Sequence, residues 1–243
     1  MTPQDRFILV TGGARSGKST FAERLAAALA EERQAATGEP ASRGGRVTYL
    51  ATSETNDAEM AARVEAHRAA RPPAWTTVEC PVGVPAAMRA HAGTLGSTIF
   101  LLDCVTFWVS NLIFAGGDLG GTDPGDEFNY DKSLLTSAQE AAVAQRVAAA
   151  VGDLIAALVE TGATLVAVSN EVGLGVVPEY PLARLYRDQL GWVNQRLAAV
   201  AESVCFLVAG LPLDLKGSAS SLASAAADPS SPYVLPSAFK EFP

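Results

Sequence analysis

A glycine-rich segment near the N-terminus limits the possible folds of this chain more than any other feature. Residues 12–19 read Gly-Gly-Ala-Arg-Ser-Gly-Lys-Ser, which fits the pattern G-x-x-x-x-G-K-[ST] in full. The apolar run 7–10 precedes this segment, and a helix-like stretch, 20–29, follows it. A strand, a glycine-rich turn and a helix, in that order, form a phosphate-binding loop. We therefore predict that the chain binds a nucleoside triphosphate.

Each part of this loop has a predicted task. The glycines let the backbone curl so that several N–H groups converge on one anion, and the helix that starts at about Lys18 adds the positive end of its dipole. The Lys18 ammonium is expected to reach the β and γ phosphates as a catalytic group, and the Ser19 hydroxyl suits Mg²⁺. Nucleotide contacts are predicted for the whole loop: Gly12, Gly13, Ala14, Arg15, Ser16, Gly17, Lys18 and Ser19.

Short apolar runs recur along the chain, with helix-length segments between most of them. They cover residues 7–10, 47–51, 99–103, 165–169 and 204–209, and residues 75–79 are expected to form a further strand at an edge. Continuous apolar strands are typical of a parallel sheet that is covered on both faces. Helices are predicted over residues 133–161, ending at Gly162, and over about residues 192–203. The expected fold is α/β and P-loop NTPase-like, with a mainly parallel sheet and helices on both faces.

The composition narrows the class of protein further. The 243 residues include 18 basic and 26 acidic side chains, giving a net charge of −8, so we expect no nucleic-acid binding. No apolar run approaches the ~20 residues that span a membrane, so no transmembrane segment is expected. The N-terminus lacks the pattern of a signal peptide, and three scattered cysteines suit a reducing cytosol, which predicts a cytoplasmic protein.

The sequence also predicts the domain organisation. Residues 1–216 are expected to form one P-loop nucleotide-binding catalytic domain, because every motif lies within them. Residues 217–243 are rich in Ser, Ala and Pro and are expected to be a C-terminal tail. Residues 33–46 have the composition of a long loop.

A second nucleotide element is predicted where the apolar strand 98–103 ends in Asp103. In phosphate-loop proteins such a carboxylate holds Mg²⁺ beside the loop hydroxyl, so Ser19 and Asp103 are the predicted metal residues. A regulatory GTPase is disfavoured because the chain has no Asn-Lys-x-Asp motif to read guanine. From the residues alone, two alternatives stay open. One is a small-molecule kinase without nucleotidyl transfer, and the other is an interaction protein switched by loss of the γ-phosphate.

Several further strings occur in a fixed order along the chain. They include Tyr49-Leu50-Ala51-Thr52-Ser53, the segment 57–71 around His67, the segment 102–112 after Asp103, and Val168-Ser169-Asn170-Glu171. In order and spacing the chain resembles the bifunctional adenosylcobinamide kinase / adenosylcobinamide-phosphate guanylyltransferase family of cobalamin biosynthesis. The resemblance extends from about Phe7 to Lys216.

This resemblance implies two reactions and a set of partners. A nucleoside triphosphate, ATP or GTP, would phosphorylate the hydroxyl of the aminopropanol arm of adenosylcobinamide. GTP would then donate GMP to that phosphate through a GMP-histidine intermediate, giving adenosyl-GDP-cobinamide. The resemblance also implies Mg²⁺ with the nucleotide, and a homo-oligomer, a trimer.

His67 is the predicted nucleophile for the covalent step. The chain has two histidines, His67 and His91, and an unprotonated imidazole suits nucleotidyl transfer. His67 lies in an arginine-rich segment whose positive charges favour the free base. In general such a segment is a solvated helix face, and the family match is what points to catalysis. His91 has only Arg89 nearby and is predicted to be a surface histidine.

The resemblance carries further nucleotide contacts over to this chain. Glu79 corresponds to a carboxylate that reads guanine, since it can accept hydrogen bonds from both N1–H and N2–H₂. For Asn170 and Glu171 the sequence leaves open a role with metal or substrate and a role in capping a loop. The other implied nucleotide contacts are Ala51, Thr52, Ser53, Arg68, Ala69, Ala70, Arg71 and Asp103.

Overall fold

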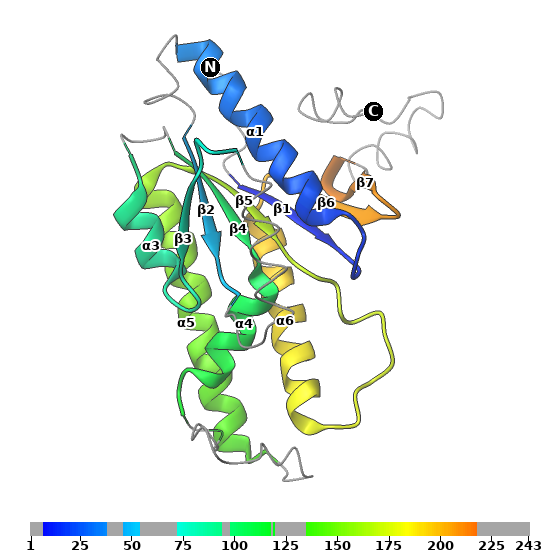
Figure 1. The fold of residues 1–243 in the computed structure, drawn as a ribbon. Coiled ribbons are helices and arrows are strands. Elements are labelled where there is room, and N and C mark those ends of the chain that lie inside the picture. Colours follow the sequence, from blue (N-terminus) through cyan, green and yellow to red (C-terminus); the bar gives the residue numbers. More distant parts are fainter. Residues whose placement is uncertain are drawn as a thin grey trace.

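The structure is a computed structural model that describes residues 7–37, 46–53, 72–93, 98–117, 119 and 135–217. Within them, seven strands form one sheet in the order β3-β2-β4-β5-β1-β6-β7 (Figure 1). All neighbouring strands are parallel except β6 and β7. The strands are β1 (Phe7–Gly12), β2 (Arg46–Ala51), β3 (Thr76–Glu79), β4 (Thr98–Asp103), β5 (Thr164–Val168), β6 (Ser203–Val208) and β7 (Leu211–Asp214). The predicted α/β fold is confirmed, and so is the edge position of the strand near residues 75–79.

Helices cover both faces of this sheet, as predicted (Figure 1). The helix α1 packs on one face, and α3 to α6 pack on the other. Successive side chains of β1 point to opposite faces of the sheet and so join both layers of the core. Ile8 and Val10 pack with α1, whereas Phe7 and Leu9 pack on the opposite side. The helices are α1 (Lys18–Thr37), α3 (Val84–His91), α4 (Val105–Phe114), α5 (Ser137–Thr161) and α6 (Pro181–Val200).

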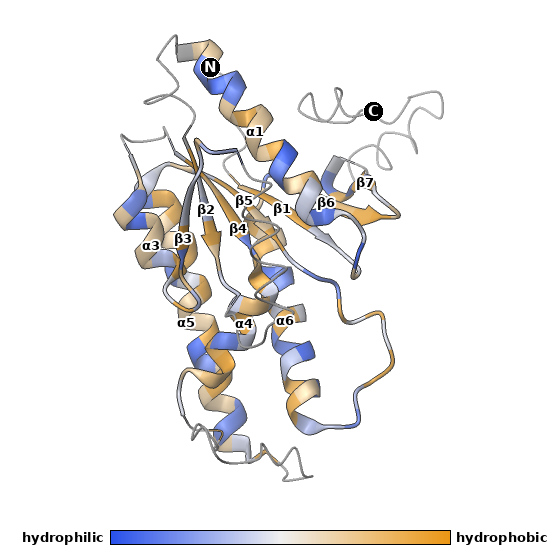
Figure 2. Cartoon of the chain, in the orientation of Figure 1, coloured by the Kyte–Doolittle hydropathy of each residue, from blue (hydrophilic) through white to orange (hydrophobic). Residues whose placement is uncertain are grey.

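The helix α5 begins and ends at the signals its sequence carries. Thr136 and Gln139 form a reciprocal capping box at its start, and Gly162, with φ of 59°, caps its end in the left-handed conformation. Among the described helices, α5 has the length and hydropathy that a membrane span requires. Its apolar stripe instead joins the core beside α4 and α6 (Figure 2), and includes Val143, Val147, Val151, Leu154 and Leu158.

Several predicted boundaries are wrong. The helix α5 begins at Ser137, so residues 135 and 136 are not helical as predicted, and α6 ends at Val200, not near residue 203. Residues 33–37 continue α1 and are not part of a loop; the Arg33 guanidinium donates hydrogen bonds to Thr98 O, at 3.5 Å, and to Thr164 Oγ1. The remaining residues of the predicted loop, 38–45, lie outside the described residues. The helix α6 begins at Pro181, not near residue 192, because proline suits the first turn of a helix.

The C-terminal end of the described chain adds a strand that the sequence did not predict. The strand β7 pairs antiparallel with β6, and a helical turn over 215–217 follows it. The Asp214 carboxylate accepts hydrogen bonds from the backbone N–H groups of Lys216 and Gly217, at 3.0 and 2.9 Å. The rest of the predicted tail, 218–243, lies outside the described residues.

All three cysteines are free and buried. Cys205 lies in β6, Cys80 follows β3, and Cys104 follows β4. Burial raises the pKa of the Cys80 and Cys104 thiols to about 11. Both are therefore protonated at neutral pH and unreactive.

Candidate nucleotide site

The predicted phosphate loop connects β1 to α1 at the carboxyl edge of the sheet. Gly17 has a φ of 88°, in the region that favours glycine. At Gly12 the reason for glycine is space, because a Cβ there would lie 2.6 Å from the carbonyl oxygen of Leu207. The loop thus needs glycine at both ends, for two different physical reasons.

Hydrogen bonds hold the loop in its curled form. The Lys18 ammonium donates to the carbonyl oxygen of Gly13 at 3.0 Å, and the backbone N–H of Phe21 donates to Gly17 at 3.0 Å to start α1. The Ser16 hydroxyl is buried and has no hydrogen-bond partner among the described residues. A buried hydroxyl without a partner inside a phosphate loop is a group that a bound ligand can satisfy.

Lys18 and Asp103 lie close enough to influence each other electrostatically. Partial burial lowers the pKa of Lys18, and the negative charge of Asp103 opposes that change. Asp103 ends β4, which is not a neighbour of β1, because β5 lies between them. The Tyr49 hydroxyl donates to Asp103 Oδ2 at 2.6 Å and fixes the orientation of the carboxylate. The sequence names Tyr49 only as part of the string 49–53 and gives it no role of its own, because this contact joins two different strands.

The segment after β2 is locked to the end of β4 through Thr52. Its hydroxyl donates to the carbonyl oxygen of Cys104 at 2.7 Å and accepts from the Cys104 N–H at 2.8 Å. The Asn111 amide donates to the carbonyl oxygens of Thr52 and Pro81, at 2.8 and 2.9 Å. Thr52 is fully buried, so its side chain has a structural task, whereas Ser53 is partly exposed.

Asn170 and Glu171 follow β5 and lie between the two nucleotide elements. The backbone N–H of Glu171 donates to Gly12 O at 3.1 Å, and that of Asn170 donates to the Thr106 hydroxyl at 3.0 Å. Glu171 Oε1 accepts from the Gly173 N–H at 2.8 Å, which caps the following loop. The Asn170 Oδ1 atom is buried without a hydrogen-bond partner in the described part of the chain.

The structure brings together some predicted site residues and leaves others outside its described residues. The phosphate loop, Ala51 to Ser53 and Asp103 all lie at the carboxyl edge of the sheet. Glu79 ends β3 opposite Ala51 in the register and is exposed. His91 is exposed on α3, with Nδ1 at 2.9 Å from the carbonyl oxygen of Ala87. The residues outside the described ranges are His67, Arg68, Ala69, Ala70 and Arg71.

Comparison with known proteins gives one consistent answer. The family model described as cobinamide kinase / cobinamide phosphate guanyltransferase matches residues 8–215. The chain is 42% identical over 209 residues to the bifunctional adenosylcobalamin biosynthesis protein CobU of Escherichia coli (strain K12), covering 86% of this chain and 99% of that protein. It is 38% identical to the bifunctional adenosylcobalamin biosynthesis protein CobP of Pseudomonas aeruginosa, covering 86% of this chain and 96% of that protein.

Proposed function

The chain belongs to the cobinamide kinase / cobinamide phosphate guanyltransferase family, and on that premise we propose that it catalyses both reactions in cobalamin biosynthesis. It phosphorylates adenosylcobinamide with ATP or GTP. It then transfers GMP from GTP to adenosylcobinamide phosphate, giving adenosyl-GDP-cobinamide and pyrophosphate. The observation that carries this proposal is the family match over residues 8–215, which includes the whole phosphate loop.

In the kinase step, the hydroxyl oxygen of the aminopropanol arm attacks the γ-phosphorus. The bond from that phosphorus to the bridging oxygen breaks, the nucleoside diphosphate leaves, and the hydroxyl proton passes to solvent. Lys18 and the converging N–H groups of the loop stabilise the charge on the transferring group. This chemistry depends on positioning and needs no covalent residue.

Mg²⁺ is the proposed cofactor of the nucleotide, held by Ser19 and Asp103. The described residues contain no group of three His, Cys, Asp or Glu side chains able to hold a metal ion. One hydroxyl and one carboxylate fit Mg²⁺ nevertheless, because this ion usually keeps several waters and shares its coordination with substrate phosphates. When bound, the ion would neutralise charge on the phosphates.

In the guanylyl step, an imidazole nitrogen of His67 attacks the α-phosphorus of GTP and pyrophosphate leaves. A phosphate oxygen of adenosylcobinamide phosphate then attacks the same phosphorus, the P–N bond breaks, and free His67 is regenerated. The proposed GTP contacts are Ala51, Thr52, Ser53, Arg68, Ala69, Ala70 and Arg71, with Glu79 reading guanine. Support for Glu79 comes from its exposure at the same edge of the sheet as the loop. Thr52 is fully buried, and its hydroxyl and backbone N–H already make hydrogen bonds, so its proposed part is to position Ser53 beside the nucleotide.

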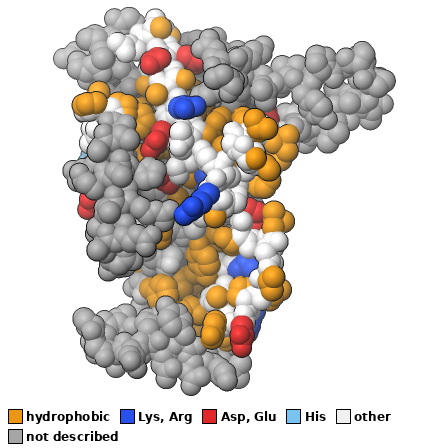
Figure 3. Space-filling view, turned by 45° about the vertical axis from the view of Figure 1, so that its right-hand side comes forward, with side chains coloured by type: hydrophobic (Ala, Val, Ile, Leu, Met, Phe, Trp, Pro, Cys, Tyr) orange, Lys and Arg blue, Asp and Glu red, His pale blue; other side chains and the backbone are white. Residues whose placement is uncertain are grey.

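The proposed setting is a cytoplasmic homo-oligomer, with a trimer as the expected form. In support, Figure 3 shows hydrophobic side chains gathered on the exposed face that it views. Leu174, Val176 and Val177, after β5, are 61% exposed or more, and Leu211, in β7, is 72% exposed. Three exposed apolar side chains within residues 174–177 suit an interaction surface. Residues 1–216 form the proposed catalytic domain, and residues 217–243 the proposed tail.

Labelled GTP tests the proposal and separates it from a kinase without nucleotidyl transfer. GTP labelled at the α-phosphate should leave acid-labile, base-stable label on the denatured protein, as a phosphoramidate does. The label should disappear in His67→Ala and persist in the matched variant His91→Ala. His67→Ala should still phosphorylate adenosylcobinamide. Label that persists without His67 would overturn the mechanism, and a chain that never becomes labelled would favour the kinase alone.

A further inference from the structure

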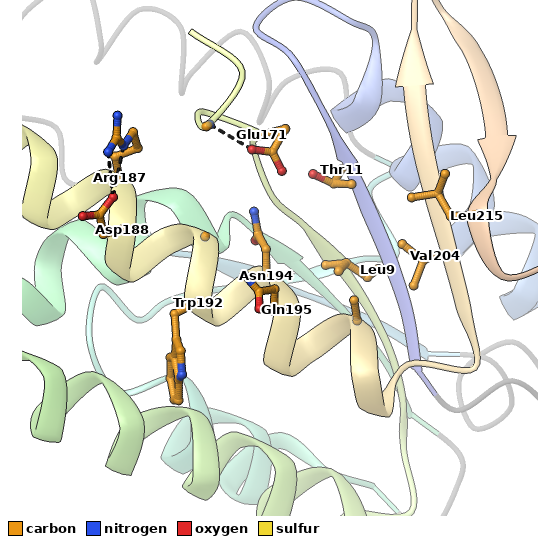
Figure 4. A pocket seen from close by; sticks show the side chains of 13 residues that line it. Leu9, Thr11, Glu171, Arg187, Asp188, Trp192, Asn194, Gln195, Val204 and Leu215 are labelled. Atoms are coloured by element: carbon orange, nitrogen blue, oxygen red, sulfur yellow. Dashed lines mark hydrogen bonds and ion pairs between the residues drawn. The ribbon is translucent and has the colours of Figure 1, made fainter. Parts of the chain in front are cut away.

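A cavity of about 530 Å³ lies on the α6 side of the sheet, beside the strand that leads into the phosphate loop. Its apolar part is formed by Leu9 and Val204 from the sheet, Ala198 from α6, and Leu215. Figure 4 shows that Thr11, Glu171 and Asn194 extend toward a common space above this apolar part, whereas the Trp192 ring points away from it.

The Thr11 hydroxyl is the most informative group in this cavity. Thr11 is 8% exposed, and its Oγ1 atom has no hydrogen-bond partner among the described residues. A buried hydroxyl without a partner carries the full cost of its lost hydration. A ligand that supplies a hydrogen bond would remove that cost, so the cavity favours an occupant with its own polar groups.

Asn194 presents a second, fixed polar group. The Ser169 hydroxyl donates to Asn194 Oδ1 at 2.6 Å, and Asn194 Nδ2 donates to the carbonyl oxygen of Asn170 at 2.9 Å. These two bonds set the orientation of the amide and leave one of its N–H groups for a ligand. An amide held in this way is suited to a carbonyl acceptor, and the neighbouring Gln195 adds a further amide at the rim.

The charges in the cavity do not suit a phosphate. The Arg187 guanidinium is paired with its neighbour Asp188 at 3.0 Å, and Glu171 adds a carboxylate. The described residues that line the cavity therefore carry no excess positive charge. Neutral groups that both donate and accept hydrogen bonds, such as amides and alcohols, match this lining better than a nucleotide does.

The cavity also adjoins the place of phosphoryl transfer. Thr11 directly precedes Gly12 in the chain, and the Glu171 N–H donates to Gly12 O at 3.1 Å. An occupant of the cavity would therefore lie against the start of the phosphate loop. A second substrate held there is positioned to deliver a hydroxyl to a nucleotide in the loop.

We propose that this cavity binds the amide-linked aminopropanol arm of cobinamide, the arm whose hydroxyl is phosphorylated. This inference rests on the proposed function. The arm is neutral and carries an amide and an alcohol, which match Thr11 and Asn194, and its carbon chain matches Leu9 and Ala198. A cavity of this volume takes a group of drug-like size, so the corrin ring itself lies outside it.

Two leucine variants on neighbouring positions of α6 test the proposal. Ala198 lines the cavity, whereas Ala199 is exposed and lies outside its lining. Leucine keeps the helix propensity of either site. In the kinase assay, Ala198→Leu should raise the KM for cobinamide about tenfold, as expected for loss of about 1.4 kcal/mol of binding, and leave the KM for ATP within about twofold. Ala199→Leu should change neither. A folded Ala198→Leu protein with unchanged KM for cobinamide, or with a raised KM for ATP alone, would overturn the proposal.

A hydroxyl deletion gives the second test, and it decides the question if Ala198→Leu does not fold. Thr11→Val removes one oxygen from a buried strand position, and Thr48→Val in β2, where Thr48 is 5% exposed, is its control. Equilibrium dialysis with cobinamide alone, followed by its visible absorbance, should show about 3- to 10-fold weaker binding for Thr11→Val only. Equal binding by both variants contradicts the cavity assignment. A wild-type chain that binds cobinamide but never phosphorylates it contradicts the proposed function instead.

Discussion

The backbone N–H of Gly210 donates a hydrogen bond to the carbonyl oxygen of Ser16 at 3.0 Å. Gly210 lies in the two-residue turn between β6 and β7, and Ser16 lies in the phosphate loop. Both turn residues have positive φ, 52° at Ala209 and 82° at Gly210, as a tight hairpin requires. In the described sheet, β6 and β7 are the one antiparallel pair. The hydrogen bond from their turn therefore supports the phosphate loop.

Replacing Gly210 tests whether this turn supports the phosphate loop. Gly210→Ala should destabilise the fold by about 1–2 kcal/mol, because φ of 82° is strained for any residue with a Cβ, although the space around it is open. Weaker support of the loop should also raise the KM for ATP. The matched change Gly152→Ala, inside α5, should stabilise the fold by about 0.5–1 kcal/mol. Urea unfolding of both variants measures whether their changes in stability have opposite signs. An equal change in the free energy of unfolding in both variants would refute the role of φ at Gly210.

Lys18 should be essential for both reactions. Lys18→Ala removes the positive charge at the β and γ phosphates, and we expect turnover to fall ~10²-fold or more. Arg24→Ala, at an exposed position of the same helix, should keep normal turnover. Steady-state assays with ATP and with GTP measure both variants. Near-normal kinase turnover without Lys18 would show that the triphosphate binds elsewhere.

The link between α3 and α5 should depend on pH. Arg89 donates to Asp153 at 2.7 Å and to Glu160 at 2.6 Å, and these bonds hold the pKa of both carboxyls below their ordinary values of 3.8 and 4.5. A carboxyl with a lowered pKa stabilises the fold above its ordinary pKa, and that contribution is lost as the pH falls through the folded value. Arg89→Ala should therefore have a lower Tm than wild type at about pH 6, and the difference should shrink toward about pH 3.

A matched arginine gives the control for this pH effect. Arg196 lies over the Trp192 ring, 5.9 Å from its centroid, so any Tm change in Arg196→Ala should not vary with pH over the same range. High salt should also reduce the effect of Arg89→Ala, because the Arg89 pairs are exposed. A Tm difference between Arg89→Ala and wild type that grows toward low pH would contradict the predicted direction of the pH dependence.

The tail should be dispensable for catalysis. A chain that ends at Lys216 keeps every predicted site residue, and it keeps the Lys216 ammonium that donates to the carbonyl oxygen of Ala201. We expect both activities at wild-type rates and a Tm within about 2 °C of the full chain, since surface changes usually cost little. Size-exclusion chromatography alongside the assays shows whether the oligomer is retained. A lost oligomer or a large fall in Tm would show that residues beyond Gly217 also belong to the folded structure.

The elements that the sequence predicted are those whose signals are local. The strands β1, β2, β4, β5 and β6 are continuous apolar runs, and the loop after β1 has a complete motif. The end of α5 was predicted because Gly162 supplies a left-handed cap. In each case a few adjacent residues carry enough information to specify the conformation.

The features that were missed depend on contacts between distant segments. The strand β7 is short, contains a proline and follows an Ala-Gly turn, so it lacks the usual signals of a hairpin. The start of α6 was placed late because Gly191 interrupts its apolar pattern. The Tyr49–Asp103 and Thr52–Cys104 hydrogen bonds join residues more than 50 positions apart, and no local pattern predicts such pairs.

Because Cys80, Cys104 and Cys205 are buried, thiol-reactive labels should not react with the native protein. With thiol pKa values of about 11 at Cys80 and Cys104 and almost no exposure at Cys205, maleimide probes at neutral pH have no ready target in the wild-type chain. One engineered surface cysteine would therefore carry a single fluorophore or spin label without prior removal of native thiols.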